Sequence, residues 1–116
     1  MPRRGADRPG RDAERRAANH YRLRGFRILD RNAWVGGYEL DLVVRRGRRL
    51  VFSEVKEKSG PAFGTPAEMV DGEKQRRIRS AASAWLEAHP EHADLTVSFD
   101  VICVQEGRLM RLAEAF

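Results

Sequence analysis

The sequence predicts a single small α/β domain in which a mixed β-sheet is flanked by helices. Short segments rich in β-branched and aromatic residues alternate with two longer segments of helical periodicity. The chain of 116 residues is long enough for one hydrophobic core and too short for two. The expected order is α-β-β-β-α-β(-β), which would place helices on both faces of the sheet.

Local signals predict where each element begins and ends. Asp12 suits an N-cap, Gly25 suits the end of the first helix, and Pro90 prevents continuation of the second helix. Strands follow from runs of β-branched and aromatic residues, and turns follow from glycine and proline. The expected elements are a helix over 12–24, a strand over 26–32, a turn over 33–37, strands over 38–44 and 50–56, a loop over 57–66, a helix over 67–89, a strand over 96–104, a short strand over 109–112 and a tail over 113–116.

The composition favours a cytoplasmic globular protein. Hydrophobic residues make up 41% of the chain and charged residues 34%, which indicates a modest core and a highly charged surface. No apolar run approaches the length of a membrane span, and the N-terminus lacks the apolar segment of a signal peptide. The single Cys103 excludes an internal disulfide and, among strand-forming neighbours, is expected to be a buried core thiol.

The net charge of +5 is concentrated near the N-terminus. Residues 1–24 contain eight arginines and three acidic residues, whereas the rest of the chain balances at 14 basic and 14 acidic residues. Residues 1–11 combine arginines with prolines and glycines and are expected to form a disordered arm, followed by one domain over residues 12–116. The arginine excess indicates a polyphosphate partner such as DNA, although an arginine-rich tail of a GC-rich genome would look the same.

A predicted β-hairpin around Gly47-Arg48 carries the most informative pattern. A two-residue loop there suits a type II′ turn, whose first position requires positive φ and therefore favours glycine. This loop would place Asp41 opposite Glu54 and Glu39 opposite Lys56. Because side chains alternate along a strand, all four charged side chains are expected on one face.

This arrangement predicts a metal-dependent phosphodiester hydrolase. Two facing carboxylates repel each other unless a cation lies between them, and Mg²⁺ is typically held by one or two carboxylates. Asp41 and Glu54 are therefore candidate ligands, and Lys56 could orient a water or neutralise a phosphate. The alternative is a network of cross-strand ion pairs on a solvated sheet face. The apolar Phe52 and Val43 on the same face favour a functional role, because charge beside a buried face is costly.

Residues outside the two strands could assist this site. Glu14 lies on the apolar stripe of the first helix, although an acid near a helix N-terminus is also favoured by the helix dipole. Lys74 lies on the apolar stripe of the second helix, from which a lysine could either extend to the surface or point into the site. Arg46 and Arg48 in the hairpin turn are candidate substrate contacts.

Other kinds of site are disfavoured. The three histidines lack metal-binding spacing and are expected on the surface. Ser53 points away from Glu54 and has no neighbouring base, which disfavours a serine nucleophile, and the sequence has no glycine-rich phosphate loop. Trp34, in the expected turn, could stack on a base or cover an edge of the core.

Several short motifs occur in an order typical of one protein family. They are Ala13-Glu14, Gly25-Phe26-Arg27-Ile28-Leu29, Arg31-Asn32, Glu39-Leu40-Asp41-Leu42, Val51-Phe52-Ser53-Glu54-Val55-Lys56, Phe63-Gly64, Lys74 and Phe99-Asp100-Val101. Over about residues 13–104 the sequence resembles the YraN family of small bacterial proteins, placed in the PD-(D/E)xK nuclease superfamily and similar to archaeal Holliday-junction resolvases. It differs from the usual family pattern at Tyr38, where glycine is common, at Ser53, and at Glu57-Lys58.

The resemblance implies a fold, a cofactor and residue roles. The fold would be restriction-endonuclease-like, the cofactor Mg²⁺ or Mn²⁺, and the active form a homodimer, as in resolvases. The implied roles are metal ligation by Asp41, Glu54 and the Val55 carbonyl, catalysis by Lys56, approach of Glu14 to the metal, support by Lys74, and a family position at Glu39.

The leading hypothesis is therefore a metal-dependent endonuclease acting on DNA, including branched or junction DNA. A second hypothesis is a non-catalytic nucleic-acid-binding module on the same fold. A third is a regulatory or scaffold protein that retains the remains of such a site.

Overall fold

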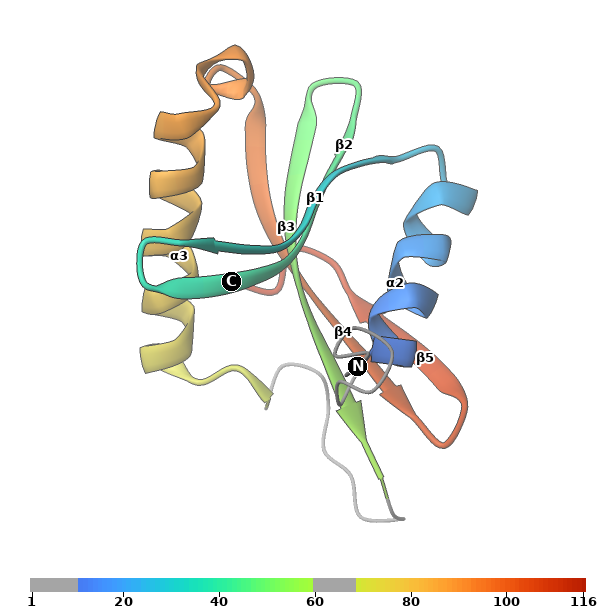
Figure 1. The fold of residues 1–116 in the computed structure, drawn as a ribbon. Helices are drawn as coiled ribbons and strands as arrows, with labels where there is room; N and C mark the ends of the chain where they lie inside the picture. Colours follow the sequence, from blue (N-terminus) through green and yellow to red (C-terminus); the bar gives the residue numbers. More distant parts are fainter. Residues whose placement is uncertain (1–10, 60–68) are drawn as a thin grey trace, which may run out of the picture.

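The predicted fold class is confirmed in a computed structural model that describes residues 11–59 and 69–116. Five strands form one mixed sheet in the order β1-β2-β3-β4-β5, in which β3 and β4 run parallel and the other neighbours antiparallel (Figure 1). The elements are α2 (Arg11–Leu23), β1 (Arg27–Val35), β2 (Tyr38–Arg46), β3 (Arg49–Lys58), α3 (Gly72–Ala88), the short 3₁₀ helix η2 (Pro90–His92), β4 (Thr96–Gln105) and β5 (Arg108–Leu112).

The two long helices lie on opposite faces of the sheet (Figure 1). On the α2 face, Ala17 and Tyr21 pack against apolar residues of β2, β3 and β4. On the α3 face, the rings of Trp85 and Phe52 pack in a T-shaped arrangement with their centroids 5.7 Å apart. Burial on both sides explains why β2 and β3 contain continuous apolar runs where they cross the core.

The β2–β3 hairpin has the predicted register around its turn. Leu42–Arg46 pairs with Arg49–Ser53, with Arg46 opposite Arg49. Gly47 has a φ of 61°, whereas Arg48 has no positive φ, which matches the expected type II′ turn. The turn glycine therefore fixes the alignment of the two strands that carry the candidate site.

The turn expected over residues 33–37 is shorter than predicted. β1 continues to Val35, and only Gly36 and Gly37 reverse the chain, both at positive φ, as a type I′ turn allows. Trp34 therefore lies on a strand, and with 74% of its surface exposed it does not cover an edge of the core.

The second helix begins later than predicted. Asp71 caps the first turn by accepting a hydrogen bond from the Lys74 N–H, so the helix starts at Gly72. Val70 is buried but precedes the helix. The predicted loop over 57–66 is also wrong at its start, because Glu57 and Lys58 extend β3; its residues 60–66 lie outside the described residues.

The smaller predictions have mixed outcomes. Cys103 is a fully buried free thiol, as expected. His89 and His92 are not surface side chains, because both stack on the Trp85 ring. Arg11, expected in the N-terminal arm, is the first residue of α2; residues 1–10 lie outside the described residues.

Substituting Gly36 with alanine is expected to destabilise the fold more than the same change at Gly37. Both alanines would be strained at positive φ, at about 1–2 kcal/mol each. A Cβ atom added at Gly36 would also lie 3.3 Å from the Ala81 Cα atom, because the tip of the β1–β2 hairpin lies against α3 (Figure 1). A Cβ atom added at Gly37 would meet only open space. Urea denaturation should show at least about 1 kcal/mol more loss for Gly36→Ala; equal losses would contradict the packing argument.

Candidate functional site

Asp41 lies where β2 separates from β3. The last pair of this ladder is Leu42 with Ser53, so Asp41 and Glu54 do not face each other as a ladder pair. Instead, the Asp41 Oδ2 atom accepts a hydrogen bond of 2.8 Å from the backbone N–H of Val55. This bond holds the Asp41 carboxylate against β3, next to the residue that carries the second acid.

The alternation of side chains along β2 is broken at the same point. Leu40 and Val43 both pack into the cluster under α3, although strict alternation would place them on opposite faces. Next to them in β1, Asn32 has a φ of 52°, in the left-handed region that asparagine tolerates better than most residues. The break in β2 therefore lies opposite a residue of β1 in the left-handed region.

The break changes which residue of β2 approaches Glu54. The expectation that Glu39 shares a face with Glu54 assumed regular alternation and is wrong. The hydroxyl of Tyr38 donates to the Glu54 carboxylate instead, at 3.3 Å. Tyr38 is thus a site residue that sequence reasoning missed; its departure from the usual family glycine was the available signal.

Glu54 is buried and surrounded by donors. Its side chain is 7% exposed, and its Oε2 atom lies 3.2 Å from the Nζ atom of Lys74, which α3 contributes. Of the two orientations that the sequence left open for Lys74, the one that points into the site is observed. The ammonium group occupies a position where it balances the charge of this carboxylate.

The surroundings of the two acids disfavour a double negative charge. Burial and the charge of Glu54 raise the pKa of Asp41 to about 8, although the Val55 N–H opposes this shift. Burial also raises the pKa of Glu54, with Lys74 opposing. Burial therefore makes the ionised form of each carboxylate unfavourable, and a bound cation would offset this electrostatic cost.

The two lysines of the site differ in their electrostatics. The contact with Lys74 lowers the pKa of Lys56, and burial adds to this effect. For Lys74, burial acts to lower the pKa, but the charge of Glu54 outweighs it and the pKa is raised. Lys56 is therefore the lysine whose ammonium group is less well stabilised, a property typical of functional lysines.

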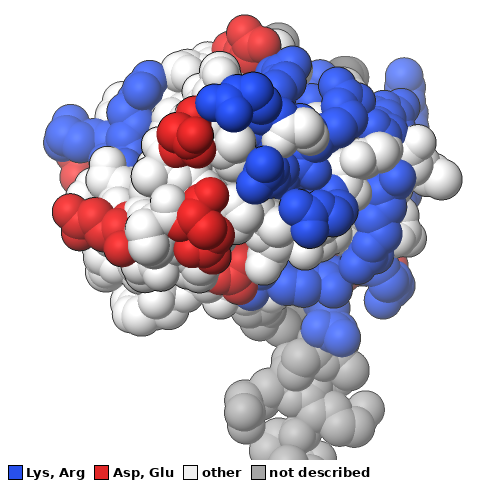
Figure 2. Space-filling model, turned by 90° about the horizontal axis from the view of Figure 1, so that it is seen from above, with Lys and Arg blue, Asp and Glu red and all other residues white. Residues whose placement is uncertain are grey.

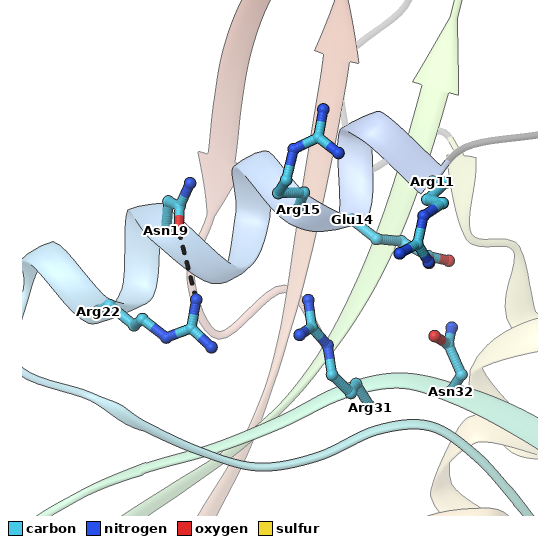
Figure 3. Close-up of a pocket in the computed structure, with 7 residues that line it drawn as sticks. All are labelled: Arg11, Glu14, Arg15, Asn19, Arg22, Arg31 and Asn32. Atoms are coloured by element: carbon cyan, nitrogen blue, oxygen red, sulfur yellow. Dashed lines mark hydrogen bonds between the residues drawn. The ribbon is translucent and has the colours of Figure 1, made fainter. Parts of the chain in front are cut away.

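Glu14 and Glu39 interact with the acid pair at longer range. The negative charges of both contribute to the raised pKa of Asp41, after the effects of burial and Glu54. Glu14 lines a cavity between α2 and β1 (Figure 3). Over residues 11–59 and 69–116, no three His, Cys, Asp or Glu side chains form a group that could hold a metal ion, so Glu14 does not complete a three-acid cluster with the pair.

Arg46 and Arg48 lie at the other end of the β2–β3 hairpin. Each is five or six residues along a strand from the acids, which corresponds to roughly 17–20 Å. Arg46 donates to the Arg24 carbonyl, and Arg48 donates to the Asp94 carbonyl. Viewed from this end, Lys and Arg side chains gather on the half of the molecule on the α2 side, and acidic side chains lie mainly on the other half (Figure 2).

Comparison with known proteins identifies the family. Residues 13–104 match the model of the uncharacterised protein family UPF0102. The chain belongs to this family. UPF0102 proteins similar to it include one from Frankia alni, 49% identical over 104 residues, covering 90% of this chain and 86% of that protein. Another, from Rhodopseudomonas palustris strain BisB18, is 42% identical over 106 residues, covering 91% and 77%.

The UPF0102 match contains the whole candidate site. Its range runs from the start of α2 almost to the end of β4, and it includes Glu14, the acid pair, Lys56 and Lys74. It leaves out β5. Within the part of the chain that is described, no helix is long and apolar enough to cross a membrane.

The residues of the site fit a divalent cation. Asp41 uses Oδ2 for the Val55 N–H, which leaves Oδ1, and Glu54 offers a carboxylate now held by Tyr38 and Lys74. Because the Val55 backbone adjoins Asp41, its carbonyl is a reasonable third oxygen. Oxygen donors of this kind, two carboxylates with a carbonyl and waters, suit Mg²⁺ or Mn²⁺.

Proposed function

We propose that this UPF0102 protein is a metal-dependent endonuclease that hydrolyses DNA phosphodiesters, including branched or junction DNA, through a site of the PD-(D/E)xK type. One observation carries the proposal: Asp41 and Glu54 are held in a buried position that raises the pKa of both acids, with Lys56 and Lys74 in contact with each other beside them. The order of the motifs supports it, since it resembles that of the YraN family.

Different residues of the site would have different roles in this reaction. Asp41, Glu54 and the Val55 carbonyl would hold Mg²⁺ or Mn²⁺, which when bound activates a water and stabilises charge on the phosphoryl oxygens. Lys56 lies two residues beyond Glu54 on β3 and can donate to the attacking water or to a phosphoryl oxygen. Tyr38 and Lys74 orient the Glu54 carboxylate.

The test is cleavage of linear, flapped and four-way DNA with Mg²⁺ or Mn²⁺. The wild type is expected to cut at least one substrate only when the cation is present. Asp41→Ala and Lys56→Ala should each reduce the rate by about 10²–10³-fold, because each removes a group that stabilises the charge of the transition state.

Arg76→Gln is the matched control for these substitutions. The Arg76 side chain is 71% exposed on α3 and pairs with Glu73, so this variant should cut like the wild type. The enzyme proposal would be overturned if the wild type cuts none of the three substrates, or if Asp41→Ala and Lys56→Ala cut as fast as the wild type.

The ion pair of Lys74 with Glu54 favours a second candidate, a non-catalytic nucleic-acid-binding module. In that case the pair is a permanent structural contact at 3.2 Å, and the basic surface alone binds the ligand. DNA binding would then be sensitive to salt and unaffected by Glu54→Ala. Deleting residues 1–24 is not a clean test of the basic region, because it removes α2 and its four buried residues.

A further inference from the structure

A cavity between α2 and β1 is lined mainly by arginines (Figure 3). Its volume is about 370 Å³, and it lies beside the candidate site without containing either member of the acid pair. Arg11, Arg15 and Arg22 line it from α2, and Arg31 lines it from β1. Glu14, Asn19 and Asn32 complete the lining.

The charge of this cavity suits an anion. Four arginines and one acidic residue, Glu14, line it, and one of the arginines, Arg15, pairs with Asp12 outside the lining. The α2 residues recur at the spacing of one helix face, so the helix presents a row of donors along the cavity. Guanidinium groups bind phosphate oxygens through paired hydrogen bonds, which makes a phosphate a more suitable ligand than a carboxylic acid beside Glu14.

The cavity arginines differ in their partners: Arg15 pairs with Asp12, whereas Arg22 and Arg31 lack a strong acceptor in the described part of the chain. In the described part of the chain, no hydrogen bond or ion pair engages the Arg31 guanidinium. Arg22 has a contact of only 3.3 Å with Asn19, the one hydrogen bond among the residues drawn in Figure 3. An anion between Arg22 and Arg31 would supply the missing acceptors.

The cavity adjoins the acid pair through two residues. Asn32 lies between Arg31 and Ala33, which pair with Leu42 and Leu40, so its neighbour across the strands is Asp41 at a Cα distance of about 5 Å. Glu14 lines the cavity and is also close enough to act electrostatically on Asp41. A nucleic-acid strand whose phosphate sits at the acids could therefore place a neighbouring phosphate in the cavity.

We propose that the cavity between α2 and β1 binds a backbone phosphate of the nucleic-acid strand next to the phosphodiester that is cut, with Arg22 and Arg31 as its main donors. This inference rests on the proposed function for the position of the cut, but the binding it describes needs no catalysis. The ligand is the phosphodiester backbone, which DNA and RNA share.

Binding without a divalent cation tests the inference separately from cleavage. Fluorescence anisotropy in EDTA would compare single-stranded DNA, duplex DNA and single-stranded RNA of one sequence over a series of salt concentrations. Arg22→Gln and Arg31→Gln are each expected to weaken DNA binding about tenfold. Each should also reduce the slope of log K against log salt by about 0.9 for duplex and 0.7 for single strands.

Arg76→Gln serves as the control, because it removes the same charge from an exposed position on α3. It should leave affinity and salt slope unchanged, and circular dichroism would confirm that all variants fold. Equal losses in Arg76→Gln and Arg31→Gln, or no loss in either cavity variant, would overturn the inference. An effect seen with RNA and absent with DNA would overturn the DNA assignment, and full competition by tripolyphosphate at equal phosphate concentration would assign the cavity to free polyphosphate instead.

The two proposals fail in different ways. Specific loss of binding in the cavity variants, with no cleavage by the wild type, would support the phosphate site and reject the nuclease. Cation-dependent cleavage with unchanged binding in Arg22→Gln and Arg31→Gln would support the nuclease and reject the phosphate site.

Discussion

Asp41→Asn is expected to raise the thermal stability of the cation-free protein at pH 8–9 while abolishing the stabilisation that Mn²⁺ gives the wild type. The pKa of Asp41 lies at about 8 in the folded protein, above its ordinary value of 3.8. Between these pH values the folded state holds a proton that the unfolded state has lost, so the contribution of Asp41 to stability falls as pH rises and is fully unfavourable above pH 8. Asparagine carries no charge and escapes this penalty.

Differential scanning fluorimetry over pH 5–9 measures this prediction. The melting-temperature difference between Asp41→Asn and wild type should grow with pH, and added Mn²⁺ should raise the melting temperature of the wild type alone. Asp94→Asn is the control, because its side chain is 79% exposed and makes only a surface contact with Arg48. A difference that stays constant from pH 5 to pH 9 would show that Asp41 is not destabilised when ionised.

Asp100→Ala is expected to reduce the free energy of unfolding by about 3–5 kcal/mol, because it leaves a buried partner charge without its counterion. The Asp100 side chain is fully buried and accepts hydrogen bonds from the Arg111 Nε atom at 2.9 Å and the Tyr21 hydroxyl at 2.7 Å. It also accepts the backbone N–H of Glu114. These bonds join α2, β4 and the C-terminal segment, so their loss would also loosen the helix that carries Glu14.

Two further variants calibrate the loss at Asp100. Tyr21→Phe removes the two hydrogen bonds that the Tyr21 hydroxyl makes with Asp100 and Ser53, and should cost about 1–3 kcal/mol. Glu114→Gln removes only the exposed ion pair with Arg49 and should cost about 0–1 kcal/mol. Chemical denaturation gives all three values, and a loss below about 1 kcal/mol for Asp100→Ala would contradict the role given to the buried charge.

The central hairpin could be predicted from the sequence because local chemistry determines it. Gly47 supplies the positive φ that the turn needs, and apolar alternation then allows one register. The rule that glycine supplies the positive φ of a tight turn also applies at Gly36 and Gly37, where the two glycines alone form the turn. β1 therefore extends three residues further than predicted.

The parts that could not be predicted depend on contacts between distant elements. The side chain of Asp71 caps α3, so the helix begins at Gly72. The apolar pattern of the sequence placed Val70 on the helix, because Val70 is a core residue although it precedes the helix. The break in β2 lies opposite Asn32 of β1, and no period in the sequence of β2 reveals it. The pairing of Asp100 with Arg111 requires β4 and β5 to be aligned first.

The order of strands in the sheet also has a consequence for the way the chain folds. β1, β2 and β3 form a meander joined by two-residue turns, so its contacts are local and close quickly. The parallel pairing of β3 with β4 joins residues as distant as Arg49 and Thr96 and must wait for the intervening helix. We therefore expect Asp41 and Glu54 to come together on the early meander, before α3 brings Lys74 to Glu54. In this order of folding, the two carboxylates come together first, and the positive charge of Lys74 joins them last.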